Sequence, residues 1–311
     1  MTTAPKISII ASAQDWVNEH LEEVDNTSFH ALYIADHPSF TTTDSWSWLA
    51  YAAGQTERIR LGTHVTGASF HHPTRLAKQV TTVDNLSGGR ATLGLGTGYD
   101  VQDYMPYGFE MPGFKDRVIY MDEMLTLMRQ MFSGAIDGFE GQFFTYEGAA
   151  DFAPLPVQQP YPTIMIGLNM AGLAMQVAAR QADAINTWQL GPAQVKAIAG
   201  PLADACIKAG RQPEDVALTC DLLMVPGEDR SGAEALAHQI RDVARGWGRK
   251  DTVTQWEAEG VLHGDGDGMC EQIMQFAEVG VSEVTISVSH IDQLRWLNEE
   301  VARVLSLPDR P

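Results

Sequence analysis

The stretch IRLGTHVTGASFHHPTRLAKQVTTVDNLSGGRATLGLGTGY, residues 59–99, decides the fold. It contains two short apolar runs, 59–65 and 91–96, which are typical of buried strands. Between them, 72–86 carries apolar residues at helical spacing, with Pro73 in the first turn, where proline is tolerated. Because parallel neighbours in a sheet need a crossover connection, this strand–helix–strand unit predicts a parallel sheet covered by helices.

The same alternation continues along the whole chain. Eight apolar runs are predicted to be strands: 8–11, 32–35, 59–65, 91–96, 163–167, 183–188, 216–225 and 283–289. Helical patterns separate them, and eight such units favour a closed (β/α)8 TIM barrel over an open doubly wound sheet. No linker rich in Pro, Gly or Ser divides the 311 residues. We therefore expect one domain over 1–311, with loop insertions at about 99–160 and 226–268 that form the substrate pocket and its lid.

Charge and composition exclude several classes of function. The chain has 40 acidic and 21 basic side chains, so its formal charge is −19. This surplus repels phosphate backbones and anionic lipid, so we expect neither a nucleic acid nor a membrane as partner. No run of apolar residues is long enough to span a bilayer, and the N-terminus lacks the apolar core of a signal peptide. With three widely spaced cysteines, these features predict a cytoplasmic protein with reduced thiols.

The glycine run Gly94-Leu95-Gly96-Thr97-Gly98 has two interpretations. It differs from a dinucleotide-binding fingerprint, because the third glycine comes one residue early and the run follows the fourth strand instead of the first. Either the glycines allow tight packing inside a barrel, or Thr97, Gly98 and Tyr99 let a flat ligand approach the backbone at the strand's end. The sequence leaves both open.

Histidines follow two neighbouring strands of the predicted barrel. Asp36 and His37 end the second strand, and His64 lies near the end of the third. The carboxyl ends of barrel strands share one rim, and a histidine there can exchange a proton near neutral pH. A purely structural histidine is the alternative, mainly for His64. No His or Cys spacing matches a known metal site, so we expect no metal.

Several short motifs, taken together in order and spacing, resemble the bacterial luciferase-like flavin oxidoreductases over essentially the whole chain. The motifs are IRLGTHV at 59–65, HP at 72–73, VDNLSGGR at 83–90, LGLGTGY at 93–99, PLPVQ at 154–158, IMIG at 164–167 and AARQADA at 178–184. The resemblance implies a TIM barrel that binds reduced FMN or the deazaflavin coenzyme F420 at its carboxyl rim.

Matched residue by residue, the resemblance also implies site residues. A cis peptide bond of the family falls between His64 and Val65. The residues expected to contact the cofactor are Asp36, His64, Val65, Thr97, Gly98 and Tyr99 around the ring, and Gly167, Leu168 and Asn169 near the phosphate. Many relatives carry Glu shortly after the glycine run, whereas this chain has Asp100 and Asp103, so the sequence does not identify a catalytic carboxylate.

These observations predict an oxidoreductase with His37 as its proton source and catalytic residue. Reduced cofactor would either activate oxygen for monooxygenation or pass hydride to a small organic substrate. The neighbourhood of Asp36 and His37, with Trp46 and Trp48, resembles the F420 branch, whereas the acidic net charge favours compact FMN. If FMN is the cofactor, a flavin reductase is the expected partner.

Two further expectations concern partners and class. The methionine-rich helix predicted at 117–132 is typical of a core or of a subunit interface, and it suggests a homodimer. The alternative to an enzyme is a non-catalytic flavin-binding barrel subunit that partners another chain. A metal-free hydrolase or aldolase fits less well, because no nucleophile with an adjacent base is evident.

Overall fold

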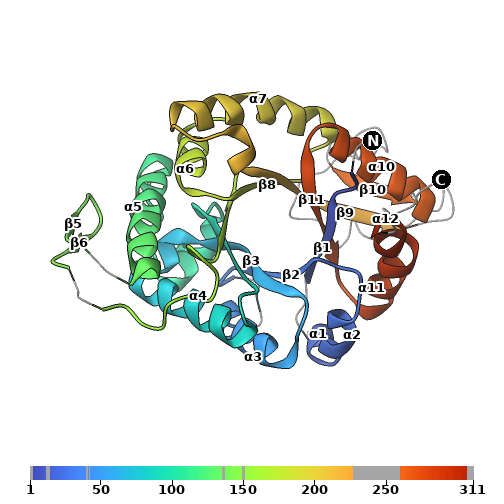
Figure 1. Ribbon diagram of the computed structural model, residues 1–311, viewed down its shortest axis with the longest axis horizontal. Coiled ribbons are helices and arrows are strands. Elements are labelled where there is room, and N and C mark those ends of the chain that lie inside the picture. The colour runs from blue at the N-terminus through green and yellow to red at the C-terminus, as the bar shows by residue number, and fades with distance from the viewer. Residues whose placement is uncertain are drawn as a thin grey trace.

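The computed structural model describes residues 3–11, 15–39, 41, 43–134, 137–148, 151–226 and 260–306. Within them, eight parallel strands close into a barrel surrounded by helices (Figure 1). In order around the barrel, the strands are β1 (Lys6–Ala11), β2 (Ala31–Asp36), β3 (Arg60–Gly67), β4 (Ala91–Gly96), β7 (Thr163–Gly167), β8 (Ala184–Trp188), β9 (Ala217–Pro226) and β11 (Val281–Val288). Pairing of β11 with β1 closes the ring. The predicted TIM barrel is confirmed.

The helices follow the strands as the apolar patterns indicated. They are α1 (Asp15–Asn18), α2 (Leu21–Asp25), α3 (Ser45–Gln55), α4 (Pro73–Ser87), α5 (Phe114–Ser133), α6 (Leu173–Gln181), α7 (Pro192–Lys208), α10 (Gly266–Glu278), α11 (Ile291–Leu297) and α12 (Arg303–Ser306). A π-helical turn at Asn298–Ala302 separates the last two. None of the helices in the described ranges is long and apolar enough to cross a bilayer.

Three short strands were not predicted. β5 (Phe139–Glu140) and β6 (Thr145–Tyr146) form a hairpin that extends from the barrel (Figure 1). β10 (Val261–Gly264) pairs with the last residues of β9. These segments are too short to show periodicity. The predicted insertion at 99–160 includes α5, one of the helices around the barrel, and most of the one predicted at 226–268 lies outside the described residues.

The methionines of α5 are core residues. Met121, Met124, Met128 and Met131 are all fully buried within this chain. Their flexible side chains fill the space between α5 and its neighbours. They therefore give no support to the homodimer that we expected from them.

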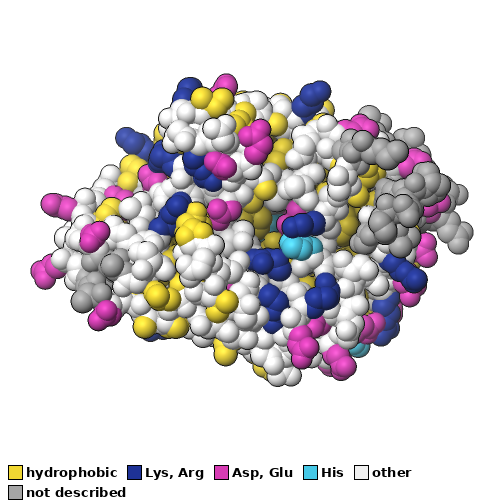
Figure 2. Space-filling view, in the orientation of Figure 1, with side chains coloured by type: hydrophobic (Ala, Val, Ile, Leu, Met, Phe, Trp, Pro, Cys, Tyr) yellow, Lys and Arg dark blue, Asp and Glu magenta, His cyan; other side chains and the backbone are white. Residues whose placement is uncertain are grey.

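Charge is distributed unevenly over this acidic chain. On the face drawn in Figure 2, Lys and Arg side chains gather near the middle around a His, while Asp and Glu lie mostly towards the outline. At the amino end of the barrel, His30 lies among Lys6, Arg58 and Arg60. Burial lowers the pKa of His30, and the three cations lower it further. The negative charge of Glu283 acts in the opposite direction but does not outweigh them. Net charge alone therefore does not describe the local potential.

Candidate active site at the carboxyl ends of the strands

The barrel places the carboxyl ends of all eight strands at one rim. Five of the sequence-predicted segments end there, at Asp36 of β2, Gly67 of β3, Gly96 of β4, Gly167 of β7 and Trp188 of β8. Segments far apart in sequence are thus brought to one site. In (β/α)8 barrels this rim holds the active site.

Val65 lies at the centre of this arrangement. The His64–Val65 peptide bond is cis, as the resemblance implied. A β-carbon on Gly96 would come within 2.8 Å of Cγ2 of Val65, and one on Gly167 within 3.3 Å of the same atom. A β-carbon on Gly94 would overlap the carbonyl oxygen of Thr63. Tight packing against β3 therefore explains the first two glycines of the run.

The third glycine of the run has a different reason. Gly98 adopts a positive φ of 74°, and a β-carbon there would overlap the hydroxyl of Tyr104. That hydroxyl lies 2.6 Å from Oγ of Ser69, which joins the loops after β3 and β4. Two 3-10 turns follow β4 instead of a helix, so a dinucleotide fingerprint is excluded. Thr97 is half-buried, and Tyr99 is exposed at 63%.

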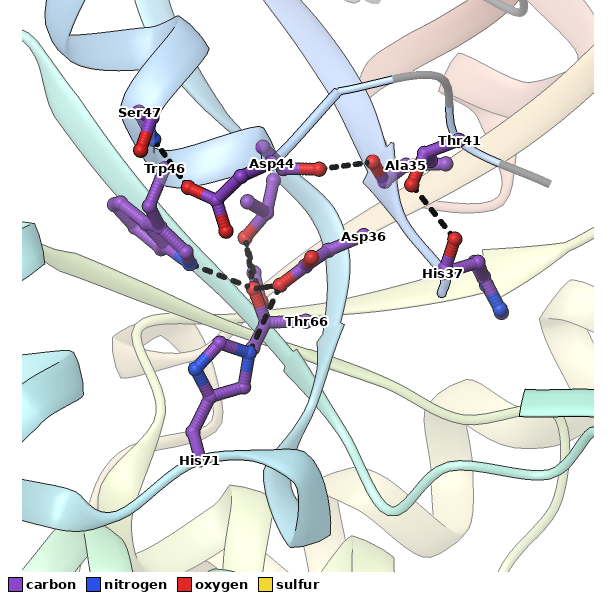
Figure 3. A network of polar contacts seen from close by, with 12 residues as sticks. Ala35, Asp36, His37, Thr41, Asp44, Trp46, Ser47, Thr66 and His71 are labelled. Atoms are coloured by element: carbon purple, nitrogen blue, oxygen red, sulfur yellow. Dashed lines mark hydrogen bonds and ion pairs between the residues drawn. The ribbon is translucent and has the colours of Figure 1, made fainter. Parts of the chain in front are cut away.

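Asp36 forms the centre of a polar network between β2 and β3 (Figure 3). Its Oδ2 accepts hydrogen bonds from Oγ1 of Thr66 at 2.8 Å and from Nε2 of His71 at 3.2 Å. Nε1 of the buried Trp46 donates to the same Thr66 hydroxyl at 3.1 Å. Burial alone would raise the pKa of Asp36. The hydrogen bonds from His71 and Thr66, together with the positive charge of His71, have the larger combined effect and lower it. The carboxylate is thus held ionised, and Trp46 supports it from the core instead of lining a pocket.

His37 is bonded to a carboxylate that the sequence did not single out. Its Nδ1 lies 2.5 Å from Oδ2 of Asp103. Oδ1 of Asp103 accepts from the backbone N of Ser39 at 3.0 Å and from its Oγ at 2.6 Å. Asp103 is buried at the end of the 3-10 turn Val101–Asp103, whereas the half-buried Asp100 caps that turn. Asp103 therefore orients His37, and Asp100 has a structural role.

His64 points into the barrel. Its ring stacks on Tyr33 of β2 with the centroids 4.9 Å apart, and its Nδ1 lies 3.5 Å from Oδ2 of Asp221 on β9. The Tyr33 hydroxyl donates to Oε1 of Glu283 at 3.1 Å, and burial raises the pKa of Tyr33. The side chain of His64 is therefore part of a buried polar layer that begins at the rim.

The loop after β7 is tied to β8. The backbone N of Leu168 donates to the carbonyl oxygen of Asn186 at 2.9 Å. Nδ2 of Asn169 donates to the carbonyl oxygen of Trp188 at 2.8 Å, and its Oδ1 accepts from the Trp188 backbone N at 2.6 Å. The side chain of Asn169 thus fixes the loop, which leaves backbone groups near Gly167 as the candidates for a phosphate.

Fold and site together define a (β/α)8-barrel protein with an acid–histidine pair and a cis peptide at the carboxyl rim. The chain belongs to the luciferase-like monooxygenase family, whose model matches residues 11–283. Among curated proteins, it is similar to an F420-dependent glucose-6-phosphate dehydrogenase of Intrasporangium calvum, with 24% identity over 92% of both chains.

Solved structures share the fold. The F420-dependent tetrahydromethanopterin reductase of Methanopyrus kandleri matches 97% of this chain and 99% of its own, with a TM-score of 0.78 and 18% identity. The monooxygenase RslO1 of Streptomyces bottropensis matches 96% of this chain and 99% of its own, with a TM-score of 0.78 and 21% identity. At these identities the likeness concerns the barrel alone.

Proposed function

We propose that this protein is an oxidoreductase that uses coenzyme F420 to transfer hydride to or from a small organic substrate, with His37 moving the accompanying proton. The observation that carries the proposal is the buried Asp103 carboxylate 2.5 Å from Nδ1 of a histidine at the barrel rim. F420 is favoured over FMN because the curated relative from Intrasporangium calvum depends on it.

The rim residues fit a flat tricyclic ring. Val65 packs over Gly96 and Gly167, which have no side chains. Together they form a flat apolar surface on which such a ring could lie. Buried polar atoms without partners lie beside it, on His64 and Asp221. When bound, the cofactor supplies the hydride or the electrons, and the protein supplies orientation and the proton.

The Asp103–His37 pair determines which ring nitrogen exchanges a proton. A carboxylate accepts, so it favours the tautomer or charge state in which Nδ1 carries hydrogen. Proton exchange with a substrate then falls to Nε2 of the ring. A positioned histidine of this kind contributes about 10²- to 10⁴-fold to rate. The backbone N–H and the hydroxyl of Ser39 both donate to Oδ1 of Asp103 and so hold this carboxylate in place.

A second candidate is an FMN-dependent monooxygenase supplied by a flavin reductase. The description of the family, luciferase-like monooxygenase, supports this candidate. A non-catalytic flavin-binding subunit is the third, and the His37–Asp103 pair disfavours it, because mere binding does not require an oriented histidine.

The proposal is tested with His37→Ala. The variant should bind F420 with a Kd within about threefold of the unmodified protein, while turnover falls by about 10²-fold or more. Glucose 6-phosphate is the first substrate to try, because the relative from Intrasporangium calvum is named for it, and turnover is followed through the absorbance of oxidised F420. His20→Ala is the matched control, since His20 is half-buried beside Glu23 in α2, outside the residues of the rim. Equal turnover of His37→Ala and His20→Ala would refute the role of His37.

A further inference from the structure

Four buried side-chain atoms that make no hydrogen bond lie on three adjoining residues. They are Nε2 of His64, Oδ1 of Asp221, and both Nε2 and Oε1 of Gln189. The three residues are exposed at only 8%, 5% and 7% respectively. A buried polar group without a partner is destabilising, so proteins retain such groups where a ligand satisfies them.

Asp221 connects the other two residues at the mouth of the barrel, Gln189 through the backbone and His64 through its side chain. Trp188 of β8 pairs with Asp221 of β9, and the next backbone N, that of Gln189, donates to the carbonyl oxygen of Asp221 at 2.9 Å. His64 reaches the carboxylate of Asp221 from β3, on the opposite wall of the barrel. The cluster therefore lies beside Val65, the neighbour of His64 at the cis bond.

Gln189 also has an unusual backbone. Its φ is 54°, and among the described residues it alone has a positive φ without being glycine. A glutamine is strained in this left-handed conformation, where glycine would be relaxed. Strain and two unpaired amide atoms in one residue are typical of a functional position.

The unpaired atoms specify the chemistry of a ligand. The Gln189 amide presents a donor and an acceptor side by side, and Oδ1 of Asp221 is a second acceptor. The complementary group is an imide, in which an N–H lies between two carbonyls. Flavins and F420 both carry such an edge on their pyrimidinedione ring.

We propose that Gln189, together with Asp221 and His64, binds the pyrimidinedione edge of the tricyclic cofactor. The imide N–H donates to Oε1 of Gln189 or to Oδ1 of Asp221, and a ring carbonyl accepts from Nε2 of Gln189. This inference rests on the proposed function. It adds Gln189 and Asp221, which the sequence motifs did not mark, to the His64 that they did.

The first test is Gln189→Leu, which keeps the size of the side chain and removes both amide groups. Titration uses F420 or FMN, whichever binds, and its N3-methyl derivative, which lacks the imide hydrogen. Gln189→Leu should raise the Kd of the unmethylated cofactor about tenfold or more. Methylation should weaken binding to the unmodified protein about tenfold or more, but by less than about threefold for Gln189→Leu.

Stability without cofactor separates this role from a structural one. Because the side-chain amide of Gln189 makes no hydrogen bond, Gln189→Leu should melt at the same temperature or higher. Gln181→Leu is the matched control: Gln181 is also buried, but its amide donates to Oδ1 of Asp122 at 2.5 Å. That variant should melt lower and leave the Kd unchanged.

The outcomes are distinguishable. Failure of the unmodified protein to bind either cofactor refutes the proposed function. Normal binding combined with an unchanged Kd for Gln189→Leu overturns only the imide subsite. A raised substrate KM with an unchanged cofactor Kd also overturns it, because the amide would then face the substrate.

Discussion

Replacement of Gly96 by alanine tests the packing that shapes the centre of the barrel mouth. The new β-carbon would lie 2.8 Å from Cγ2 of Val65 and 4.0 Å from its Cβ. Carbon atoms pack best at about 3.5–4.0 Å, so the first contact forces Val65 or its strand to move. Overpacking of this kind costs about 1–3 kcal/mol. Gly96→Ala should therefore lower the free energy of unfolding by that amount.

Val65→Ala should remove most of this cost. It deletes Cγ2 and leaves the contact of 4.0 Å with Cβ, which is ordinary. In that background Gly96→Ala should change stability by less than about 0.5 kcal/mol, or stabilise slightly, since alanine restricts the unfolded chain. The coupling free energy between the two substitutions is then about 1–3 kcal/mol.

Urea unfolding of the four proteins, followed by circular dichroism, measures this cycle. Gly54→Ala is the control, because a β-carbon at Gly54 in α3 meets nothing within 4 Å. It should stabilise by up to about 1 kcal/mol and show no coupling to Val65→Ala. Additive costs for Gly96→Ala and Val65→Ala would refute the account of the glycine run.

Two further predictions concern the carboxylates of the rim. Asp103→Asn should leave the Kd of the cofactor within about threefold but lower turnover about 10²-fold or more, since a neutral amide no longer favours hydrogen on Nδ1 of His37. Turnover equal to that of the unmodified protein would show that Asp103 does not position His37 for proton transfer. Asp36→Asn should lose less stability than the unmodified protein when the pH falls into the acid range. The pKa of Asp36 is lowered in the folded protein, so its contribution is complete above the ordinary value of 3.8 and is lost as the pH falls through the folded value. Urea unfolding at about pH 7, 4 and 3 measures this contribution, and an acid dependence identical in both proteins would contradict it.

The sequence predicted the barrel because its strands are buried on both faces. Apolar runs such as 91–96 and 163–167 therefore stand out from the amphipathic helices between them. The short strands β5, β6 and β10 lack such a pattern, and their pairing depends on partners in the folded chain.

The site was predictable where one segment carries the signal. His37 follows its strand directly, and the glycine run marks the end of β4. The sequence left Asp100 and Asp103 as alternatives, because 66 residues separate Asp103 from His37 and only the fold joins them. Gln189 carried no signal at all, since its significance lies in a positive φ and in unpaired atoms. His64 was expected at the cofactor, and the structure adds that its side chain extends from the end of β3 into the barrel, towards Tyr33 and Asp221.

The central claim, a redox cofactor held at the carboxyl rim, is tested most directly by equilibrium titration of the purified protein with F420 and, separately, with FMN. The account predicts saturable binding of F420 at one molecule per chain, with a change in the absorbance of its ring, and weaker binding of FMN. Tighter binding of FMN would refute the F420-dependent activity and support the FMN-dependent monooxygenase instead. Binding of neither would contradict the account.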